Sequence, residues 1–284
     1  MWYIDGKTKR SVKEMIRKFI AAFVIIFFAA STASAEGIKS GADWDKGLLI
    51  VEGNAVGPPT LDKNARFYKN FARQGARLDA LNKLVEYLGA AESFSNVELN
   101  EISEKFSHEN PAMKIIERGA RQIGEATFDK DGVCTVWMSL PLFGENSVAQ
   151  GLCLSLKTQS KKDFPQPTPV ENISEKYTGL IVDCRGFKVY RNLTQNISCV
   201  SEKESVTIYG AEYLDFNKIG DTFINQGMVS YVRDMKDAAR AGNNPLVVKA
   251  INSGVVSVAD AVLILNANRT CGFLDRCAVV FVMD

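Results

Sequence analysis

Four charged side chains stand beside apolar runs in the second half of the chain and could form a catalytic or binding site. They are Asp183, Arg185, Asp234 and Lys249. If they converge, they could act as a general acid and base or bind an anion, because burial and neighbouring charges shift pKa values. The alternative is a structural ion-pair cluster, or single charges at the ends of strands. The sequence favours this structural interpretation and leaves the chemical one open.

Six cysteines form a second set of reactive side chains. If the chain is exported, as its first residues predict, an even number of cysteines indicates disulfides. Sequence proximity favours three pairs, which are Cys271 with Cys277, Cys184 with Cys199, and, by elimination, Cys134 with Cys153. Many other pairings are possible, so proximity sets only an order of preference.

The sequence lacks groups that several classes of enzyme need. His108 is the only histidine and lies in a polar segment, and no Cys-x-x-Cys occurs. A zinc site and a serine or cysteine hydrolase are therefore disfavoured. The segment Gly53 to Gly57 lacks the Lys-Ser/Thr end of a phosphate-binding loop. With 34 basic and 33 acidic residues there is no surplus charge for nucleic acid. We expect no catalytic residue, no cofactor, no metal and no nucleic-acid partner.

The first residues predict export. Phe19 to Ala30 is an apolar run behind two basic residues, and it is too short for a membrane span of roughly 20 residues. Small side chains at 33–35 suit a signal peptidase. We expect a signal peptide over residues 1–35 that is cleaved after Ala35, with translation starting at Met15. The mature chain should be periplasmic, without a later transmembrane segment or a lipid anchor. An uncleaved amino-terminal anchor is the alternative.

One long helix organises the first predicted domain, residues 47–156, which follows a polar lead-in at 36–46. A strand is expected at Leu48–Val56, and a helix from Asp62 to Gly89. The helix is predicted by an apolar seam at alternating four- and three-residue steps. The seam comprises Phe67, Phe71, Gln74, Leu78, Leu81, Val85 and Leu88. A second stripe carries only methyl groups, so another backbone could approach it closely. This stripe comprises Ala65, Ala72, Ala76 and Ala80. We expect the helix to be covered on both sides.

The remainder of the first domain should contain a strand at 93–99, an interrupted helix over 101–118 and a β-hairpin. The hairpin joins Arg121–Phe128 to Val133–Leu140 through Asp131-Gly132, which supplies the positive φ angles of a tight turn. One face of its second strand is apolar and is expected to cover the long helix. That face comprises Cys134, Val136, Met138 and Leu140.

Residues 157–176 contain three prolines at alternate positions and predict a stiff linker. A proline-rich ligand for a partner is the alternative. The second domain, 177–284, interleaves strands and helices without the regular spacing of a doubly wound sheet. We expect strands at 180–184, 197–200, 206–209, 228–232, 245–251 and 278–283, and helices at 234–241 and 257–268. Both halves are predicted to be α+β.

Three motifs of the first domain resemble a bacterial envelope family. They are ARQGARLDA at 72–80, the strand end EGNA at 52–55, and Asp131-Gly132. On these motifs, residues 47–156 resemble the twenty-kilodalton bacterial lipoprotein family and the related amino-terminal domain of flagellar assembly protein T. This chain lacks the lipobox cysteine of the lipoproteins. In the second domain, 177–183, 226–229 and 244–250 are similar to a carboxy-terminal region found beside that domain in other exported bacterial proteins.

The resemblance implies a non-enzymatic envelope protein that binds other proteins of the envelope or the flagellum. Its expected role is the assembly or stabilisation of a surface organelle such as the flagellum. Peripheral association with the outer membrane stays open. The alternative, from another class, is a periplasmic small-ligand-binding protein or an enzyme that uses the charges of the second domain.

Overall fold

The computed structural model describes residues 39–93, 111–201 and 204–284. The expected signal peptide with its cleavage site, His108 and most of the strand expected at 93–99 therefore lie outside the described residues. Ser93 itself is the last residue of a helix. None of the helices in the described ranges is long and apolar enough to cross a membrane.

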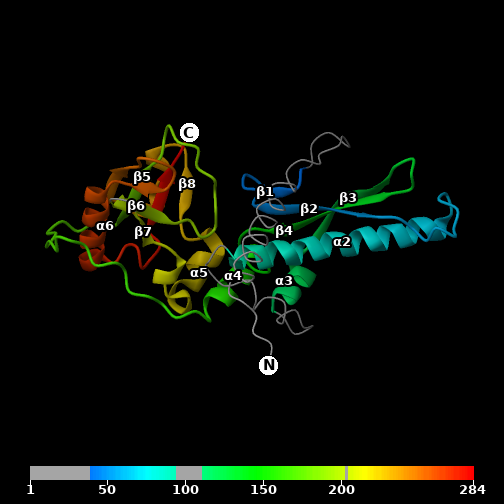
Figure 1. Ribbon diagram of the computed structural model, residues 1–284, viewed down its shortest axis with the longest axis horizontal. Coiled ribbons are helices and arrows are strands. Elements are labelled where there is room, and N and C mark those ends of the chain that lie inside the picture. Colours follow the sequence, from blue (N-terminus) through cyan, green and yellow to red (C-terminus); the bar gives the residue numbers. More distant parts are fainter. Residues whose placement is uncertain (1–38, 94–110, 202–203) are drawn as a thin grey trace, which may run out of the picture. The chain divides into compact units, whose positions relative to one another are not determined.

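The first half contains a four-stranded antiparallel sheet with one long helix across it (Figure 1). The strands lie in the order β1-β2-β4-β3. The elements are β1 (Gly41–Asp43), β2 (Leu48–Ala55), α2 (Arg66–Ser93), α3 (Pro111–Gly119), β3 (Arg121–Phe128), β4 (Cys134–Pro141) and α4 (Val148–Leu156). The expected hairpin is confirmed, and Gly132 in its turn has a φ of 83°. The strand β1 and the helix α4 were not expected.

The second half contains a parallel sheet in the order β8-β11-β5-β9 and a smaller sheet in the order β10-β6-β7. Its strands are β5 (Gly179–Asp183), β6 (Ile197–Ser201), β7 (Glu204–Tyr209), β8 (Ser230–Val232), β9 (Pro245–Lys249), β10 (Val255–Val256) and β11 (Val279–Val282). Its α-helices are α5 (Phe216–Gln226) and α6 (Val258–Cys271). Together the two halves form an α+β fold, as the sequence predicts.

Two local predictions for the second half need correction. The helix expected at 234–241 is a pair of 3₁₀ turns, η3 (Met235–Asp237) and η4 (Ala239–Ala241), and a further 3₁₀ turn, η2 (Ala211–Tyr213), follows β7. The helix α5 was not expected. It begins at Asp215, whose side chain accepts a hydrogen bond from the Asn217 amide, and its last turn is followed by Gly227 at a φ of 67°. Both features are ordinary helix-end signals.

The helix α2 packs on the sheet through residues spaced four apart, and the expected seam is not its core face. The buried residues are Tyr68, Ala72, Ala76, Ala80, Leu84 and Leu88. The carboxy-terminal part of the seam is half-buried or buried, whereas Phe67, Phe71 and Leu78 are 71%, 50% and 61% exposed. The prediction of cover on both sides is therefore wrong for the amino-terminal part of the helix.

The backbone of a strand packs closely against the alanine stripe, as the sequence predicts. A methyl group added to Gly53 of β2 would overlap the carbonyl oxygen of Ala76 and lie 2.5 Å from the backbone nitrogen of Ala80. Because small side chains bring the middle of the helix this close, the larger apolar side chains opposite the stripe come from the strands, while Tyr68, Leu84 and Leu88 add bulk nearer the ends of α2. Val136, Met138 and Leu140 of β4 are fully buried against it, which confirms the expected apolar face of β4.

Side chains of α2 also satisfy the open edge of β2. The strand β1 pairs only with Leu48–Ile50, so the following backbone groups of β2 lack a strand partner on that side. The Asn54 amide donates to the Asp79 carboxylate at 2.8 Å, and the Lys83 ammonium donates to the Glu52 carbonyl at 2.9 Å. Because these backbone groups are already hydrogen-bonded, this edge of β2 is protected from pairing with another strand.

The proline-containing segment 157–176 lies against the second half as a strap. Asn266 of α6 is buried, and its side chain accepts a hydrogen bond from the Glu171 amide and donates one to the Pro169 carbonyl, both at 3.0 Å. Upstream, the ring of Phe164 stacks on that of Tyr213 with centroids 5.3 Å apart. These contacts fix a segment that composition alone predicts to be a free linker.

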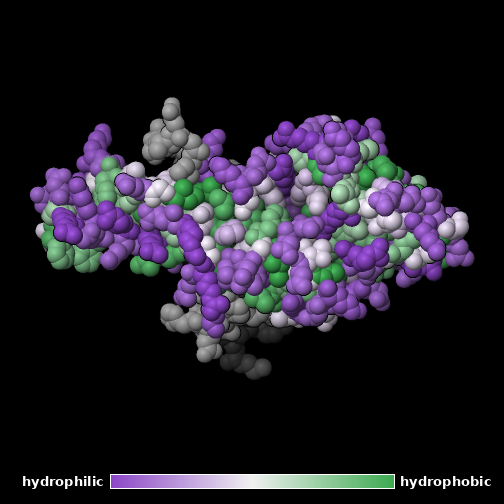
Figure 2. Space-filling model, turned by 180° about the vertical axis from the view of Figure 1, so that it is seen from behind, coloured by the Kyte–Doolittle hydropathy of each residue, from purple (hydrophilic) through white to green (hydrophobic). Residues whose placement is uncertain are grey.

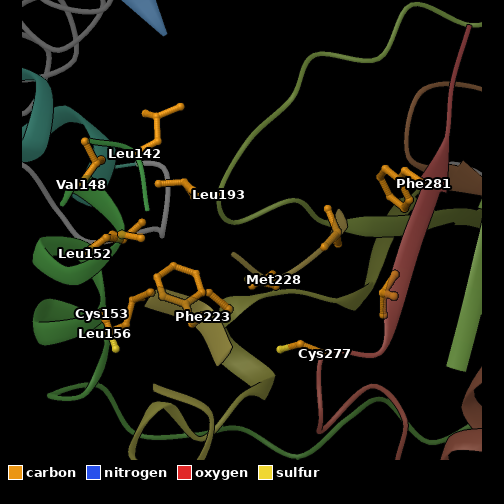
Figure 3. Close-up of a cluster of buried hydrophobic side chains, with 14 of the residues drawn as sticks. Leu142, Val148, Leu152, Cys153, Leu156, Leu193, Phe223, Met228, Cys277 and Phe281 are labelled. Carbon is orange, nitrogen blue, oxygen red and sulfur yellow. The ribbon is translucent and has the colours of Figure 1, made fainter. Parts of the chain in front are cut away.

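One apolar cluster joins the two halves (Figure 3). Leu152 and Leu156 of α4 lie beside Phe223 of α5, and all three are buried. The Gly144 amide donates to the Ile224 carbonyl at 2.9 Å in the same region. Residues 40–284 therefore form one compact unit, which gives α2 a fixed base.

Candidate functional site

The four parallel strands of the second half end at one edge, and the predicted charges lie at or just beyond it. Asp183 ends β5 and stands opposite Lys249, which ends β9. Arg185 follows β5, and Asp234 follows β8 within electrostatic reach of Arg185. The structure thus brings the four residues to one region. The carboxyl ends of parallel strands are where ligands bind in open α/β sheets.

Two of these charges, Asp183 and Arg185, form an ion pair with each other, whereas Asp234 pairs with Lys236 at 3.0 Å. The Arg185 guanidinium donates from Nε and Nη2 to the two carboxylate oxygens of Asp183, at 2.9 and 2.7 Å. This pairing lowers the pKa of Asp183 and raises that of Arg185. A backbone hydrogen bond from Lys236 likewise lowers the pKa of Asp234. A carboxyl group with a lowered pKa is a weak general base and is not protonated near pH 7, so neither residue suits acid–base chemistry.

The edge is open to solvent. The Arg185 side chain is 48% exposed despite its ion pair. An open depression beside it is lined by Gly186, Phe187, Lys188, Val189, Met283 and Asp284. Within the described ranges, no cluster of three histidine, cysteine or acidic side chains could hold a metal ion. These features match the ion-pair interpretation better than the catalytic one.

All six cysteines lie in the described residues as free thiols, so none of the three predicted pairs is formed in this structure. Burial raises the pKa of five of them, which are Cys134, Cys153, Cys184, Cys199 and Cys277. The members of the first predicted pair have different neighbours. The buried Cys277 thiol is near the Tyr209 hydroxyl, which donates to the Met228 carbonyl at 2.9 Å, whereas the half-buried Cys271 thiol lies 3.7 Å from the Glu175 carbonyl oxygen.

Sequence reasoning missed a polar site around Arg240. Its guanidinium donates to the carbonyls of Gln226, Gly227 and Cys277 at 3.1, 2.8 and 2.6 Å, and to the Ser230 hydroxyl at 3.2 Å. Two of these carbonyls end α5, where a helix carries partial negative charge. Burial lowers the pKa of Arg240. Because four of its five N–H donors go to this chain's own groups, the site is structural. No sequence motif around Arg240 predicts these hydrogen bonds.

The most distinctive surface feature is the exposed apolar face of α2, formed by Phe67, Phe71 and Leu78. The rings of Phe67 and Phe71 lie 6.4 Å apart, and Gln74 lies exposed between Phe71 and Leu78. Other apolar residues interrupt the largely hydrophilic surface on the side shown in Figure 2. Exposed apolar side chains are common singly, but three large ones along one stretch of a helix indicate a contact surface.

Comparison with known families matches one part of the chain. Residues 179–284 are similar to a domain described as the second domain of Treponema pallidum Tp0624. That description names no activity, ligand or partner. No curated protein matches the chain. The matched region begins at β5 and contains the whole parallel sheet and the ion-pair edge, so the similarity covers nearly the entire second half.

Proposed function

We propose that this chain is an exported, non-enzymatic envelope protein that binds another protein through the apolar face of α2. The exposure of Phe67, Phe71 and Leu78 on a helix that is anchored along its opposite side carries this proposal. The core of the first half closes through the alanine stripe, so folding does not need these three side chains. Large apolar side chains that the core does not use are typical of binding surfaces.

The setting of the proposed function is the cell envelope, and it rests on sequence features. The export signal expected at 1–35 supports a periplasmic location for the mature chain, and residues 47–156 resemble envelope lipoproteins and flagellar assembly protein T. The proposed role is therefore assembly or stabilisation of a surface organelle such as the flagellum. The ion pair between Asp183 and Arg185 supports the non-enzymatic part, because it occupies the groups that could do chemistry.

A deletion strain tests this function. We expect loss of motility or of the envelope barrier, rescue by the wild-type chain, and failure of rescue by Phe71→Ser/Leu78→Ser at equal abundance. Tyr190→Ser/Val170→Ser is a matched control, because its two side chains are also well exposed, at 70% and 59%. The periplasmic fraction should contain a chain whose intact mass begins at Glu36. Normal motility and an intact barrier in the deletion strain would overturn the proposal.

A small-ligand site is the second candidate, favoured by the position of Lys249, Asp183 and Arg185 at the carboxyl edge of a parallel sheet. Inorganic phosphate is a suitable first probe, because Lys249 forms no ion pair with another described residue. A rise in Tm with phosphate that Lys249→Gln abolishes would favour this candidate. An unchanged Tm would count against it.

A further inference from the structure

The exposed face of α2 has the spacing with which one helix receives another. Phe67, Phe71, Gln74 and Leu78 follow one another at steps of four, three and four residues. Alternating steps of this kind place side chains along a helix as the knobs of a coiled-coil seam. The 11-residue interval from Phe67 to Leu78 spans about 16 Å at the helical rise. A partner helix of about three turns would cover it.

One flank of this face is basic. From Lys63 to Leu78 the chain has five basic residues and no acidic one. At helical periodicity Arg66, Arg73 and Arg77 fall on the same side of the seam. The guanidinium of Arg73 lies 6.0 Å from the centre of the Phe128 ring. Neither Arg66 nor Arg77 forms an ion pair with another described residue.

The acidic residue on the other flank, Asp79, is already engaged. Asp79 accepts hydrogen bonds from the Asn54 amide and from Lys83, at 2.8 and 2.7 Å. On the arginine side, next to Phe128, the Asp129 carboxylate accepts hydrogen bonds from the amides of Asp131 and Val133, both at 2.9 Å. The arginine flank is therefore available to an incoming carboxylate, and charge complementarity calls for an acidic partner.

A second copy of this chain fits the face poorly. The exposed parts of Phe67, Phe71 and Leu78 amount to roughly 300 Å², whereas a standard interface buries about 800 Å² on each side. The remaining area would have to come from the flanks, where two copies would present the same arginines. Like charges across an interface disfavour pairing.

We propose that the face formed by Phe67, Phe71 and Leu78, with its arginine flank, binds an amphipathic helix of another protein. That helix carries apolar side chains at three- and four-residue steps and aspartate or glutamate along one side. This inference rests on the proposed function and names the chemistry of the partner. The apolar side chains provide contact area, while Arg66 and Arg77 fix the direction and register of the bound helix.

Site-specific photocrosslinking in intact cells tests the proposal with the full-length chain. A photoreactive amino acid at Gln74 sits in the middle of the face and leaves the apolar side chains in place, and one at Tyr190 is the control. Mass spectrometry should identify an adduct with an acidic peptide of another protein whose apolar residues recur at helical steps. The double variant Arg66→Glu/Arg77→Glu should reduce the adduct at least tenfold, whereas Lys218→Glu/Lys236→Glu, at two exposed lysines, should not.

Charge exchange completes the test. Lysine in place of the acidic residues of the crosslinked peptide should restore the adduct with Arg66→Glu/Arg77→Glu. An adduct with this chain itself, with lipid, or with a peptide that lacks the acidic helical pattern would overturn the inference, and so would an adduct that is insensitive to charge reversal. A protein adduct of the wrong chemistry leaves the proposed function standing. The lack of any protein adduct at Gln74 would overturn both.

Discussion

Replacing Gly53 of β2 with alanine should destabilise the chain strongly, because α2 leaves no room for a methyl group there. The new carbon would lie 2.5 Å from the Ala80 nitrogen and 2.7 Å from the Ala80 Cβ, where ordinary contacts begin at 3.4 Å. The obstructing atoms belong to the backbone and Cβ of a helix, so a side-chain rotation cannot relieve the overlap. The helix or the strand must move by about 1 Å.

The cost follows from what that movement breaks. A gap of 0.5–1 Å forfeits roughly a quarter to a half of each dispersion contact that it opens, here along the whole alanine stripe. It also stretches the 2.8 Å hydrogen bond from the Asn54 amide to Asp79. Overpacking of this kind costs about 3 kcal/mol at the upper end of its usual range. The urea midpoint should fall by roughly 1 M.

Urea unfolding followed by circular dichroism and by tryptophan fluorescence measures this effect. Gly151→Ala is the matched control: its new Cβ would meet only ordinary contacts at 3.7 Å in the interior of α4, and alanine favours a helix by up to about 1 kcal/mol. Phe71→Ser should change stability by less than about 0.5 kcal/mol, as exposed positions do. A neutral Gly53→Ala with a costly Phe71→Ser would mean that α2 faces the sheet through its seam, and would refute the packing described above.

Three further predictions concern the second half. Arg240→Leu should cost about 3 kcal/mol in urea unfolding because it leaves buried carbonyls without donors; Arg240→Lys should recover less than half, and a loss below about 1 kcal/mol would contradict this role. Since Arg185 lowers the pKa of folded Asp183, the pair stabilises the chain above the pKa of an unfolded aspartate, about 4, and that stability disappears as pH falls through the folded pKa. The stability difference between wild type and Asp183→Asn should therefore narrow below about pH 4, and a constant difference would argue against the pairing. In the native chain Cys271 should be alkylated first, because the other five thiols are buried. In denaturant without reductant, six alkyl groups should be added to each chain. A disulfide found by peptide mapping would contradict this expectation of six free thiols.

Local patterns predicted the elements that local interactions determine. The hairpin of β3 and β4 was predictable because Asp131-Gly132 and the alternation of side chains act within a few residues. The parallel order β8-β11-β5-β9 was not, because each pairing joins strands far apart in sequence. The meeting of Asp183 with Lys249 depends on that order. Listing the charges was therefore possible from sequence, whereas finding that Lys249 lies opposite the Asp183–Arg185 ion pair required the fold.

The helices α4 and α5 and the strap at 157–176 escaped prediction for different reasons. The apolar residues of α4 occur within a short segment and lack a long period, although the Ser147 hydroxyl caps the first turn by accepting a 3.1 Å hydrogen bond from the Gln150 amide. The strap has the composition of a linker, and residues distant in sequence hold it in place, among them Tyr213 and the buried Asn266. The composition of a segment indicates whether it can form a hydrophobic core of its own. It does not indicate whether the segment packs against a core formed by other parts of the chain.

For α2, helical periodicity predicted the helix correctly but predicted the wrong face toward the core. The bulky seam and the alanine stripe both recur at helical spacing. The seam is expected to face the core because its larger side chains would bury more apolar area. The packing of a helix on a sheet is also stabilised when their backbones approach closely, and the alanines opposite Gly53 allow this approach. The sheet then supplies the bulk through Val136, Met138 and Leu140. Because the stripe closes the core by itself, changes at Phe71 or Leu78 can alter binding without unfolding the chain. Folding and recognition therefore occupy opposite faces of α2 and can be tested separately.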